Sequence, residues 1–544
     1  MNILLIALYN KGMAIEFEEI GLECIAAYLR ERGYTVHMLN IRDFEGSNSI
    51  QTIKNLNPDI IGFTCYSASK QSIFDTAEAL KREMPDISII LGGNLATFNG
   101  MDIMEQCPHI DYTIMGEGEY VFEKLLGCIK EPYRKGIESI HGLIYRKDNA
   151  ICYNEGGIPV EELDALPPPA RDLLTQYNKG VALMSSTRGC KGRCSYCSST
   201  VFFQKLRVRS VSKVLDEMES VSRQYNINCF DFIDGSFEDS ATAQPRYREI
   251  AQGIMDRNME VYYFVNFRAN AYKTLTEADL DLLKSSGLFG VLVGVESNNG
   301  QDLKLYRKMS ELKDNDKCMS FFLNKDIFVN LGFIMFNPYS TVEGLLENID
   351  FLERYNVACN MQRVKSKLQI YNGTHMFDEA KADGLLVEET MYNCINYRFW
   401  NEKLEPLYLY LEHFMLHNND INFFNFHSVK GRLFLYYAKA MVKRNRDFDA
   451  YSLLSEFSVI TNQILRQINF YIAKWFRKLV YLANFTWDSQ EADRITSEIV
   501  SYEILHDLRS QYDLHWKKLL RKLSHQYSHI LNMVSNSITY DINK

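Results

Sequence analysis

The sequence predicts an α/β protein built from a parallel, doubly wound sheet, a partial barrel of six βα units and a helical C-terminal domain. Short apolar, β-branched runs alternate with helical patterns over residues 1–130, and a second alternation of the same kind occupies residues 181–370. From about residue 385 onward the pattern is helical and rich in Tyr, Phe and Leu. Strands that alternate with helices predict parallel sheets, because each helix returns the chain to the starting edge of the sheet.

The first alternation predicts five strands with helices between them. The strand candidates are Ile3–Leu8, Thr35–Leu39, Asp59–Thr64, Ile87–Leu91 and Tyr112–Met115. The helix candidates are Glu16–Glu31, Ile50–Asn55, Lys70–Arg82, Asn99–Cys107 and Tyr120–Ile129. Ligands of such sheets lie beyond the carboxyl ends of the strands, so the residues that follow each strand are candidates for binding.

A connector is predicted between the two alternations. Gly142–Tyr153 has the pattern of a hairpin with its turn at residues 147–149. The three prolines at 167–169 favour an extended linker, because proline lacks the amide hydrogen that helices and sheet interiors require. The predicted parts are a sheet domain at 1–135, a hairpin and linker at 136–180, the barrel at 181–384 and the helical domain at 385–544.

The second alternation predicts the six βα units of the barrel. Its strand candidates are Ala182–Ser186, Cys229–Ile233, Val261–Phe267, Phe289–Val295, Ile327–Met335 and Lys365–Ile370. Its helix candidates are Val211–Arg223, Ala243–Met255, Glu277–Ser285 and Val342–Arg354. Functional residues of βα barrels lie at the C-terminal ends of the strands.

Composition limits the class of function. A net charge of −9 and a pI near 5.8 argue against a general nucleic-acid binder, which carries a basic surface. No stretch reaches the ~18 uncharged apolar residues of a membrane span, and the first apolar run, Ile3–Leu8, is short for a signal peptide. We expect a cytoplasmic protein whose cysteines mostly stay reduced.

The stretch RGCKGRCSYC, which begins at residue 188, carries the strongest chemical signal. Cys190, Cys194 and Cys197 fall within eight residues. A structural zinc site needs four ligands, and the next candidates, Cys229 and His375, lie far along the chain. Three cysteines can instead hold a [4Fe–4S] cluster and leave one iron open. The spacing predicts this cluster, with zinc binding and a chance spacing as the alternatives.

With this loop placed directly after the first barrel strand, the sequence resembles the radical S-adenosylmethionine (SAM) superfamily. Tyr196, between the last two cysteines, also matches the motif of that family. The resemblance implies that the open iron binds the amino and carboxylate groups of SAM. It further implies that reduction of the cluster releases a 5′-deoxyadenosyl radical from SAM.

The resemblance also implies SAM contacts at the ends of the second, third and fourth barrel strands, in FIDGSFEDS, YFVNFRAN and GVLVGVES. The first stretch departs from the usual Gly-Gly-Glu of the family. The implied contacts are Asp234, Gly235 and Ser236 for the amino group, Arg268 for the carboxylate, and Glu296 and Ser297 for the ribose and carboxylate. The alternative for Arg268 and Glu296 is an interstrand or surface ion pair.

The first sheet lacks the common nucleotide motifs. No Gly-x-Gly-x-x-Gly follows the first strand, where the chain reads LYNKGMAIEF, and no Walker-type loop is present, which argues against NAD and nucleoside triphosphates. Glycines do close two later strands, in LGGN and GEGE. Such glycines let a bulky ligand approach the backbone closely, or they form only tight turns.

Residues 1–370 resemble the cobalamin-binding class of radical SAM proteins in the order of their parts, from a flavodoxin-like sheet through LGGN, GEGE and LDALPPPARDLL to the cysteine loop. The implied cobalamin contacts are Gly92 and Gly93 at the nucleotide tail, Gly116, Glu117 and Gly118 in GEGE, and Cys65, Tyr66 and Ser67 near the lower face of the corrin. The Asp-x-His-x-x-Gly that supplies a cobalt ligand in many cobalamin proteins is absent from this domain. A domain that has lost its cofactor is the alternative.

The two cofactors together imply methyl transfer to an unactivated carbon of a natural-product or peptide precursor. Acid–base chemistry does not break a strong C–H bond at neutral pH, whereas a positioned radical does, and methylcobalamin could then deliver a methyl group. The alternatives are a cobalamin-dependent ring rearrangement or cyclisation, radical SAM chemistry without cobalamin such as methylthiolation, and a non-enzymatic cobalamin carrier or sensor. The residues of the catalytic step itself are not identified.

The expected partners follow from the hypothesis of a cobalamin-dependent radical SAM enzyme. They are a small-molecule or peptide substrate and an external electron donor of the flavodoxin or ferredoxin type, with no nucleic acid and no membrane span. A basic group late in the chain could bind an anionic substrate or a leader peptide, or could form a solvated surface; its members are Arg466, Lys474, Arg477 and Lys478.

Overall fold

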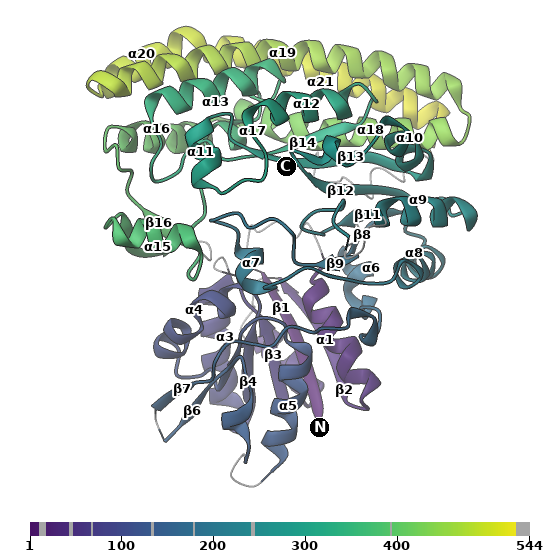
Figure 1. The fold of residues 1–544 in the computed structure, drawn as a ribbon, viewed down its shortest axis with the longest axis vertical. Helices are drawn as coiled ribbons and strands as arrows, with labels where there is room; N and C mark the ends of the chain where they lie inside the picture. The colour runs from purple at the N-terminus through teal and green to yellow at the C-terminus, as the bar shows by residue number, and fades with distance from the viewer. Residues whose placement is uncertain are drawn as a thin grey trace.

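The protein forms three layers along its long axis (Figure 1). The N-terminal α/β domain lies at one end, the barrel in the middle, and the long C-terminal helices cover the barrel on its far side. The computed structural model describes residues 1–9, 18–42, 47–66, 69–131, 135–148, 150–177, 180–240, 245–391 and 394–528.

The N-terminal domain is a seven-stranded sheet in the order β2-β1-β3-β4-β5-β6-β7. Five strands are parallel, and they are β1 (Asn2–Tyr9), β2 (Thr35–Arg42), β3 (Ile60–Thr64), β4 (Ser88–Gly92) and β5 (Tyr112–Ile114). The predicted hairpin, β6 (Leu143–Lys147) and β7 (Ala150–Tyr153), adds to β5 in antiparallel fashion. All five strands predicted from sequence are formed, and the strand order reverses between β1 and β3.

Helices cover both faces of this sheet, so each face has a separate apolar core. Leu5 and Phe122 belong to one core, and Leu4 and Ile73 belong to the other. Burial on both faces explains why the central strands are continuously apolar and not alternating. The helices are α1 (Ile20–Glu31), α2 (Ser47–Asn55), α3 (Lys70–Glu83), α4 (Asn94–Gln106) and α5 (Glu119–Lys130).

The barrel contains a parallel sheet in the order β14-β13-β12-β11-β8 within the described residues. Its strands are β8 (Val181–Met184), β11 (Cys229–Phe232), β12 (Tyr262–Arg268), β13 (Leu288–Glu296) and β14 (Phe328–Phe333). The helices around it are α8 (Val211–Tyr225), α9 (Arg246–Asp256), α10 (Glu277–Ser286), α11 (Gly300–Leu305), α12 (Leu312–Leu323), α13 (Val342–Arg354), α14 (Met361–Val364) and α15 (His375–Ala382).

The sixth predicted barrel strand is not formed as a strand. Residues 365–370 make two isolated β-bridges, Phe336 with Lys367 and Ile370 with Ile395. The N–H groups of Met335 and Phe336 both donate to the Ser366 carbonyl, an irregular pattern that cannot extend into a ladder. The barrel therefore has five regular strands among the described residues, and this segment closes it only loosely.

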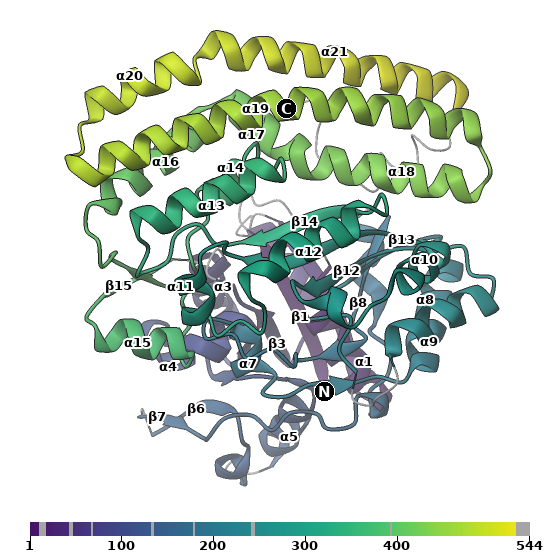
Figure 2. The same ribbon diagram turned by 45° about the horizontal axis from the view of Figure 1, so that its top comes forward.

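The C-terminal region packs its helices on the outside of the barrel (Figures 1 and 2). A hairpin that the sequence did not predict precedes them, formed by β15 (Leu386–Met391) and β16 (Cys394–Tyr397). The longest helix, α19, lies along α13 and α18. No helix in the described part of the chain is both long and apolar enough to cross a membrane. The helices are α16 (Leu404–His417), α17 (Asn419–Phe426), a π-helical turn at His427–Gly431, α18 (Arg432–Arg444), α19 (Phe448–Phe485), α20 (Ser489–Ile499) and α21 (Tyr502–Gln526).

Candidate functional site

The three cysteines lie in a loop that leaves the barrel and returns to it at one point. Strand β9 (Thr187–Arg188) pairs antiparallel with β10 (Arg207–Val208), and the loop between them carries the cysteines and helix α7 (Ser198–Phe202). Gly189 opens the loop with a φ of +82°, and a Cβ atom there would lie 2.3 Å from the Lys205 carbonyl oxygen. The closure of the loop therefore requires glycine at this position.

Ser195 holds the loop against the barrel. Its Oγ donates to the Leu305 carbonyl at 2.7 Å, its N–H donates to the Tyr306 carbonyl at 3.0 Å, and its own carbonyl accepts from the Met376 N–H at 2.9 Å. The predicted SAM contact Tyr196 packs edge-on against the Tyr306 ring with the centroids 5.2 Å apart. Residues far along the chain therefore hold the loop in place, although the three cysteines themselves lie close together in the sequence.

Arg268, at the end of β12, lies beside the first cysteine. Its Nη1 is 3.7 Å from Cys190 Sγ, and its two Nη atoms donate to Asp239 at 3.0 and 2.8 Å. Its Nε lies 3.2 Å from Glu238 Oε1, and Asp239 also accepts the Lys191 N–H at 2.8 Å. The guanidinium that we expected to bind the SAM carboxylate is therefore already paired with two carboxylates and lies next to Cys190, a predicted cluster ligand.

The cysteine loop fits an iron–sulfur cluster. Burial raises the pKa of the Cys190 thiol to about 11 and also raises that of Cys194, so formation of thiolates requires the positive charge of bound iron. The Gly192 N–H donates to Cys190 Sγ at 3.2 Å, a contact that stabilises a thiolate. Among the described residues no three His, Cys, Asp or Glu side chains are placed around one metal ion. A four-iron cube needs no such convergence, because each cysteine binds a different iron.

Glu296 and Lys308 form a charged pair at the mouth of the barrel. Glu296 ends β13 with a φ of +69°, an unusual backbone conformation for a residue other than glycine. It turns its carboxylate over two glycines, since a Cβ atom on Gly294 or Gly332 would lie 2.8 or 3.3 Å from Oε1. Lys308 Nζ lies 3.8 Å from that oxygen and donates to the Gly294 carbonyl at 3.0 Å. Burial has the largest effect on the pKa of the Cys194 thiol and raises it. The nearby Lys308 lowers this pKa, and Glu296 raises it.

Two of the predicted SAM contacts are buried in internal networks. Asp234 is 1% exposed, and its Oδ1 accepts from the backbone N–H groups of Ser186 at 2.7 Å and Thr187 at 2.9 Å. Ser297 is fully buried and donates to Asp302 at 2.7 Å. Asp234 therefore supports the strand end that leads into the cysteine loop, and Ser297 supports the start of α11.

The neighbours of Asp234 have similar supporting positions. Ser236 is fully buried, and its Oγ donates to Glu238. Gly235 lies against the cysteine loop, because a Cβ atom there would be 3.0 Å from the Cys190 Cβ. This close approach explains the glycine, and it brings the end of β11 directly beneath the first cysteine.

A cavity of about 240 Å³ lies between the N-terminal sheet and the cysteine loop. The sheet side includes Gly92, where a Cβ atom would meet nothing within 4 Å, and Gly93, whose φ is +92°. Arg188, Phe202 and Phe203 form part of the barrel side. Bare glycine backbone facing an open, mostly apolar space fits the nucleotide tail of a corrinoid. Gly116, Glu117 and Gly118 line the same cavity.

The two described residues that we expect near the corrin face differ in exposure: Cys65 is buried and Tyr66 is exposed. Cys65 is fully buried in the core, and burial raises the pKa of its thiol to about 12. Tyr66 is 37% exposed and donates its hydroxyl to Glu19 at 2.9 Å, which also accepts from Tyr9 at 2.7 Å. Ser67 lies outside the described residues.

The GEGE segment is fastened to the base of the cysteine loop. Arg207 donates to both carboxylate oxygens of Glu117 at 2.7 and 2.8 Å, and Arg188 donates to Glu119 at 2.6 Å. These residues lie on paired strands β9 and β10, one at each end of the loop. The carboxylate of Glu117, which was predicted to contact cobalamin, joins the two domains, and Glu117 lines the cavity together with Gly116 and Gly118.

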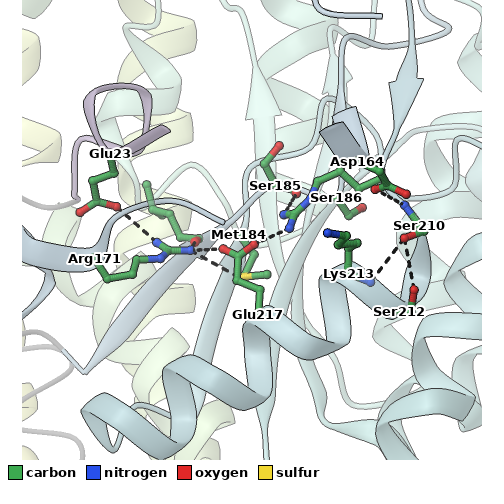
Figure 3. A network of polar contacts seen from close by, with 12 residues as sticks. Glu23, Asp164, Arg171, Met184, Ser185, Ser186, Ser210, Ser212, Lys213 and Glu217 are labelled. Atoms are coloured by element: carbon green, nitrogen blue, oxygen red, sulfur yellow. Dashed lines mark hydrogen bonds and ion pairs between the residues drawn. The ribbon is translucent and has the colours of Figure 1, made fainter. Parts of the chain in front are cut away.

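A second buried junction lies in the linker, around Arg171. Its guanidinium donates to Glu18 at 2.5 Å, lies 3.6 Å from Glu23, and also binds Glu217 of helix α8. Figure 3 shows Arg171 between Glu23 of the first domain and Glu217 of the barrel. Burial, together with the negative charge of the neighbouring Glu18, raises the pKa of Glu23 to about 9. A protonated Glu23 relieves the repulsion among three carboxylates.

Sequence reasoning missed five charged residues that surround the cysteine loop. Glu238 and Asp239 follow the predicted strand end in FIDGSFEDS, so their position could have indicated them. The other three gave no local signal, because their partners lie far away in the chain, and they are Arg188, Arg207 and Lys308.

Comparison with known families assigns both halves of this arrangement. Residues 13–126 match the B12 binding domain, and residues 184–352 match the radical SAM superfamily. The first match contains the glycines of the cavity, and the second contains the three cysteines, Arg268 and Glu296. The corresponding cofactors are cobalamin, a [4Fe–4S] cluster and SAM.

Individual relatives match a large part of the chain. The chain is 26% identical over 343 residues to the anaerobic magnesium-protoporphyrin IX monomethyl ester cyclase of Rubrivivax gelatinosus, covering 61% of each protein. It is 25% identical over 342 residues to the hopanoid C-3 methylase of Methylococcus capsulatus, covering 60% of this chain and 62% of that protein. The matches thus span less than two thirds of either relative.

A solved structure shares the whole fold. The cobalamin-dependent SAM radical enzyme OxsB, with aqua-cobalamin and SAM bound, matches with a TM-score of 0.65 over 98% of this chain and 83% of that chain. The sequence identity is 17%. The likeness includes the helical C-terminal region, which neither family model covers.

Proposed function

We propose that the protein methylates an unactivated carbon of a natural-product or peptide precursor. The chain joins a B12-binding domain to a radical SAM domain and so belongs to the cobalamin-binding radical SAM proteins. The radical SAM assignment rests on the family match and on the cysteine loop. The choice of methylation is supported by the hopanoid C-3 methylase among the relatives.

The chain's own residues would hold and orient the cofactors. When bound, the cluster and SAM supply a radical that removes a hydrogen atom, and cobalamin supplies a methyl group. Cys190, Cys194 and Cys197 would each bind one iron. Lys308 would donate to the SAM carboxylate, and Glu296 would accept from the ribose hydroxyls. Arg268 would stabilise the Cys190 thiolate and would not bind SAM directly.

One observation carries the proposal: a single cavity is walled by the glycine edge of the first sheet and by the ends of the cysteine loop. Gly92 and Gly93 lie on one side, and Arg188 and Phe202 lie on the other. The same loop thus borders the proposed sites of both cofactors.

Anaerobic reconstitution tests the proposal. We expect about four irons and a single bound corrin for each chain, and cleavage of SAM to 5′-deoxyadenosine once a flavodoxin-type donor is supplied. Methyl transfer predicts S-adenosylhomocysteine as a second product. Iron without corrin would favour radical SAM chemistry that has lost cobalamin, and uptake of zinc in place of iron would refute both.

A cobalamin-dependent cyclisation is the second candidate, favoured by the cyclase among the relatives. It predicts 5′-deoxyadenosine without S-adenosylhomocysteine, because no methyl group leaves SAM. Labelling the methyl group of SAM with deuterium separates the two functions, since only methylation transfers the label to a product.

A further inference from the structure

Helix α7 joins a predicted cluster ligand to the wall of the cavity. Cys197 caps its N-terminus, and Phe202 and Phe203 at its other end line the cavity. Figure 1 shows α7 at the boundary between the N-terminal domain and the barrel. The Cys197 carbonyl accepts from the Thr200 N–H at 3.2 Å and from Thr200 Oγ at 2.7 Å. A helix of five residues rises only ~7.5 Å, so a shift at the cavity end reaches Cys197 through a short, hydrogen-bonded segment.

Phe202 and Phe203 contribute two aromatic rings to the lining of the cavity. Each is partly exposed, and the rings pack edge-on with their centroids 4.8 Å apart. The Phe202 carbonyl lies 4.0 Å from the position that a Cβ atom on Gly116 would take, so the end of α7 lies against the GEGE segment. Aromatic side chains bury much surface against ligands in concave sites. A corrinoid in this cavity would therefore pack against the end of the cysteine loop.

The two ends of the cysteine loop are fastened outside the barrel. Arg188, at the first end, lines the cavity and donates to Glu119 of the N-terminal domain at 2.6 Å. After the two phenylalanines, Gln204 Nε2 donates to the Gly157 carbonyl of the connector at 3.0 Å. The segment that carries the cysteines is thus held between contacts that border the cavity. Binding in the cavity and ordering of the loop therefore involve the same contacts.

We propose that Phe202 and Phe203 couple the two cofactor sites. A corrinoid packed on the rings would stabilise the folded cysteine loop, and a cluster bound by Cys197 would fix the rings for corrinoid binding. Coupling between two sites is reciprocal and typically changes an affinity by ~5–150-fold. This inference assumes that cobalamin binds. It goes beyond the proposed function, because it concerns cofactor binding and applies to methylation and cyclisation alike.

The affinity for cobalamin, measured with and without the cluster, tests the coupling. The full-length protein is kept anaerobic before and after cluster reconstitution, and hydroxocobalamin binding is measured by equilibrium dialysis. We expect the cluster-loaded protein to bind ~10-fold or more tightly than the cluster-free protein. Bound cobalamin should also slow the release of iron to a chelator. Equal cobalamin affinities in the two states would overturn the proposal.

Substitution of the rings separates this route from a general effect on folding. The double variant Phe202→Ala, Phe203→Ala should bring the ratio of the two cobalamin affinities close to one. If circular dichroism shows that this variant is unfolded, the milder Phe202→Leu, Phe203→Leu keeps the apolar character and should still lower the ratio, because it removes the flat rings. Phe74→Ala, in α3 and outside the cavity lining, is the matched control and should keep the ratio of the wild type.

The salt bridge at the other end of the loop is the competing route. Glu119→Gln removes the charge that pairs with Arg188 and leaves the rings in place, so it should keep most of the ratio. Loss of the ratio in Glu119→Gln, with its retention in the phenylalanine variants, would overturn the assignment to the rings. A wild type that takes up iron but binds no cobalamin would reject this inference and the proposed function together, whereas equal affinities would reject the coupling alone.

Discussion

At the scale of single residues, the site is organised by charges that are placed in pairs around the cysteine loop. Arg268 lies 3.7 Å from Cys190 Sγ and is fixed there by Asp239. Lys308 lies between the Glu296 carboxylate and the Gly294 carbonyl. The two cations thus have different neighbours, the Cys190 thiol for Arg268 and the Glu296 carboxylate for Lys308.

Cys194→Ala should abolish cluster assembly. Three thiolates are the smallest set that holds the cube here, and alanine leaves two. Iron content and the visible absorbance of the reconstituted protein measure the loss. Cys128→Ala, in helix α5 away from the loop, is the matched control and should keep its iron. Full iron incorporation in the Cys194 variant would contradict the assignment of the loop.

Lys308→Met should weaken SAM binding by ~10–100-fold, the usual loss for one charge-assisted hydrogen bond. Cluster content should stay unchanged, because Lys308 is not a ligand. The change of the reduced cluster's EPR signal on SAM addition measures the affinity. Lys313→Met, on the surface beside Glu311, serves as the control. If SAM affinity survives in the Lys308 variant, another residue binds the carboxylate.

At the scale of elements, the cysteine loop is closed at its base by two short paired strands, each only two residues long. Strands β9 and β10 meet at Thr187–Arg188 and Arg207–Val208, and arginines from both strands bind the GEGE segment of the other domain. The loop is therefore a joint between the domains as well as a metal-binding segment. A change at its base should affect both.

Gly189→Ala should disrupt this joint. The new Cβ would lie 2.3 Å from the Lys205 carbonyl oxygen, and the φ of +82° disfavours any side chain, so we expect a cost of about 1–3 kcal/mol. Reduced iron incorporation and a lower unfolding temperature are the readouts. Gly127→Ala is the control, because it lies within helix α5 with nothing within 4 Å of its Cβ. That change should be neutral or slightly stabilising.

At the scale of the whole molecule, buried charge networks join the domains that hold the cofactors. Arg171 of the linker reaches Glu23 in the first domain and Glu217 in the barrel (Figure 3). On the other side, Arg444 of α18 donates to the Met259 and Val261 carbonyls and attaches the helical region to the barrel. Such buried contacts favour one fixed arrangement of the three layers.

Glu23→Gln should change how stability depends on pH. The pKa of Glu23 is raised from 4.5 to about 9 in the folded protein, so its contribution is fully present below pH 4.5 and is lost as the pH rises through 9. The variant lacks this titration. Its unfolding temperature should fall less than that of the wild type over this range, and should exceed it at the alkaline end. Glu498→Gln, on the surface, should follow the wild type.

Much of the architecture could be predicted from the sequence, because strand and helix periodicities are local. The five strands of the first sheet and the hairpin were found this way, whereas residues 365–370 were predicted as a strand and form only bridges. The local sequence pattern of that segment is typical of a strand. The pairing of its neighbour Phe336 with the Ser366 carbonyl, which no local pattern reveals, stopped the ladder.

The three candidate cluster ligands and the order of the domains could be predicted from the sequence alone, because three cysteines within eight residues and the alternation of strands and helices are properties of neighbouring residues. The pairing of the charges depends on the tertiary structure. It pairs Arg268 with Asp239 and places Lys308 beside Glu296. The physical reason is that an ion pair depends on distance in space, and strand order and register set that distance.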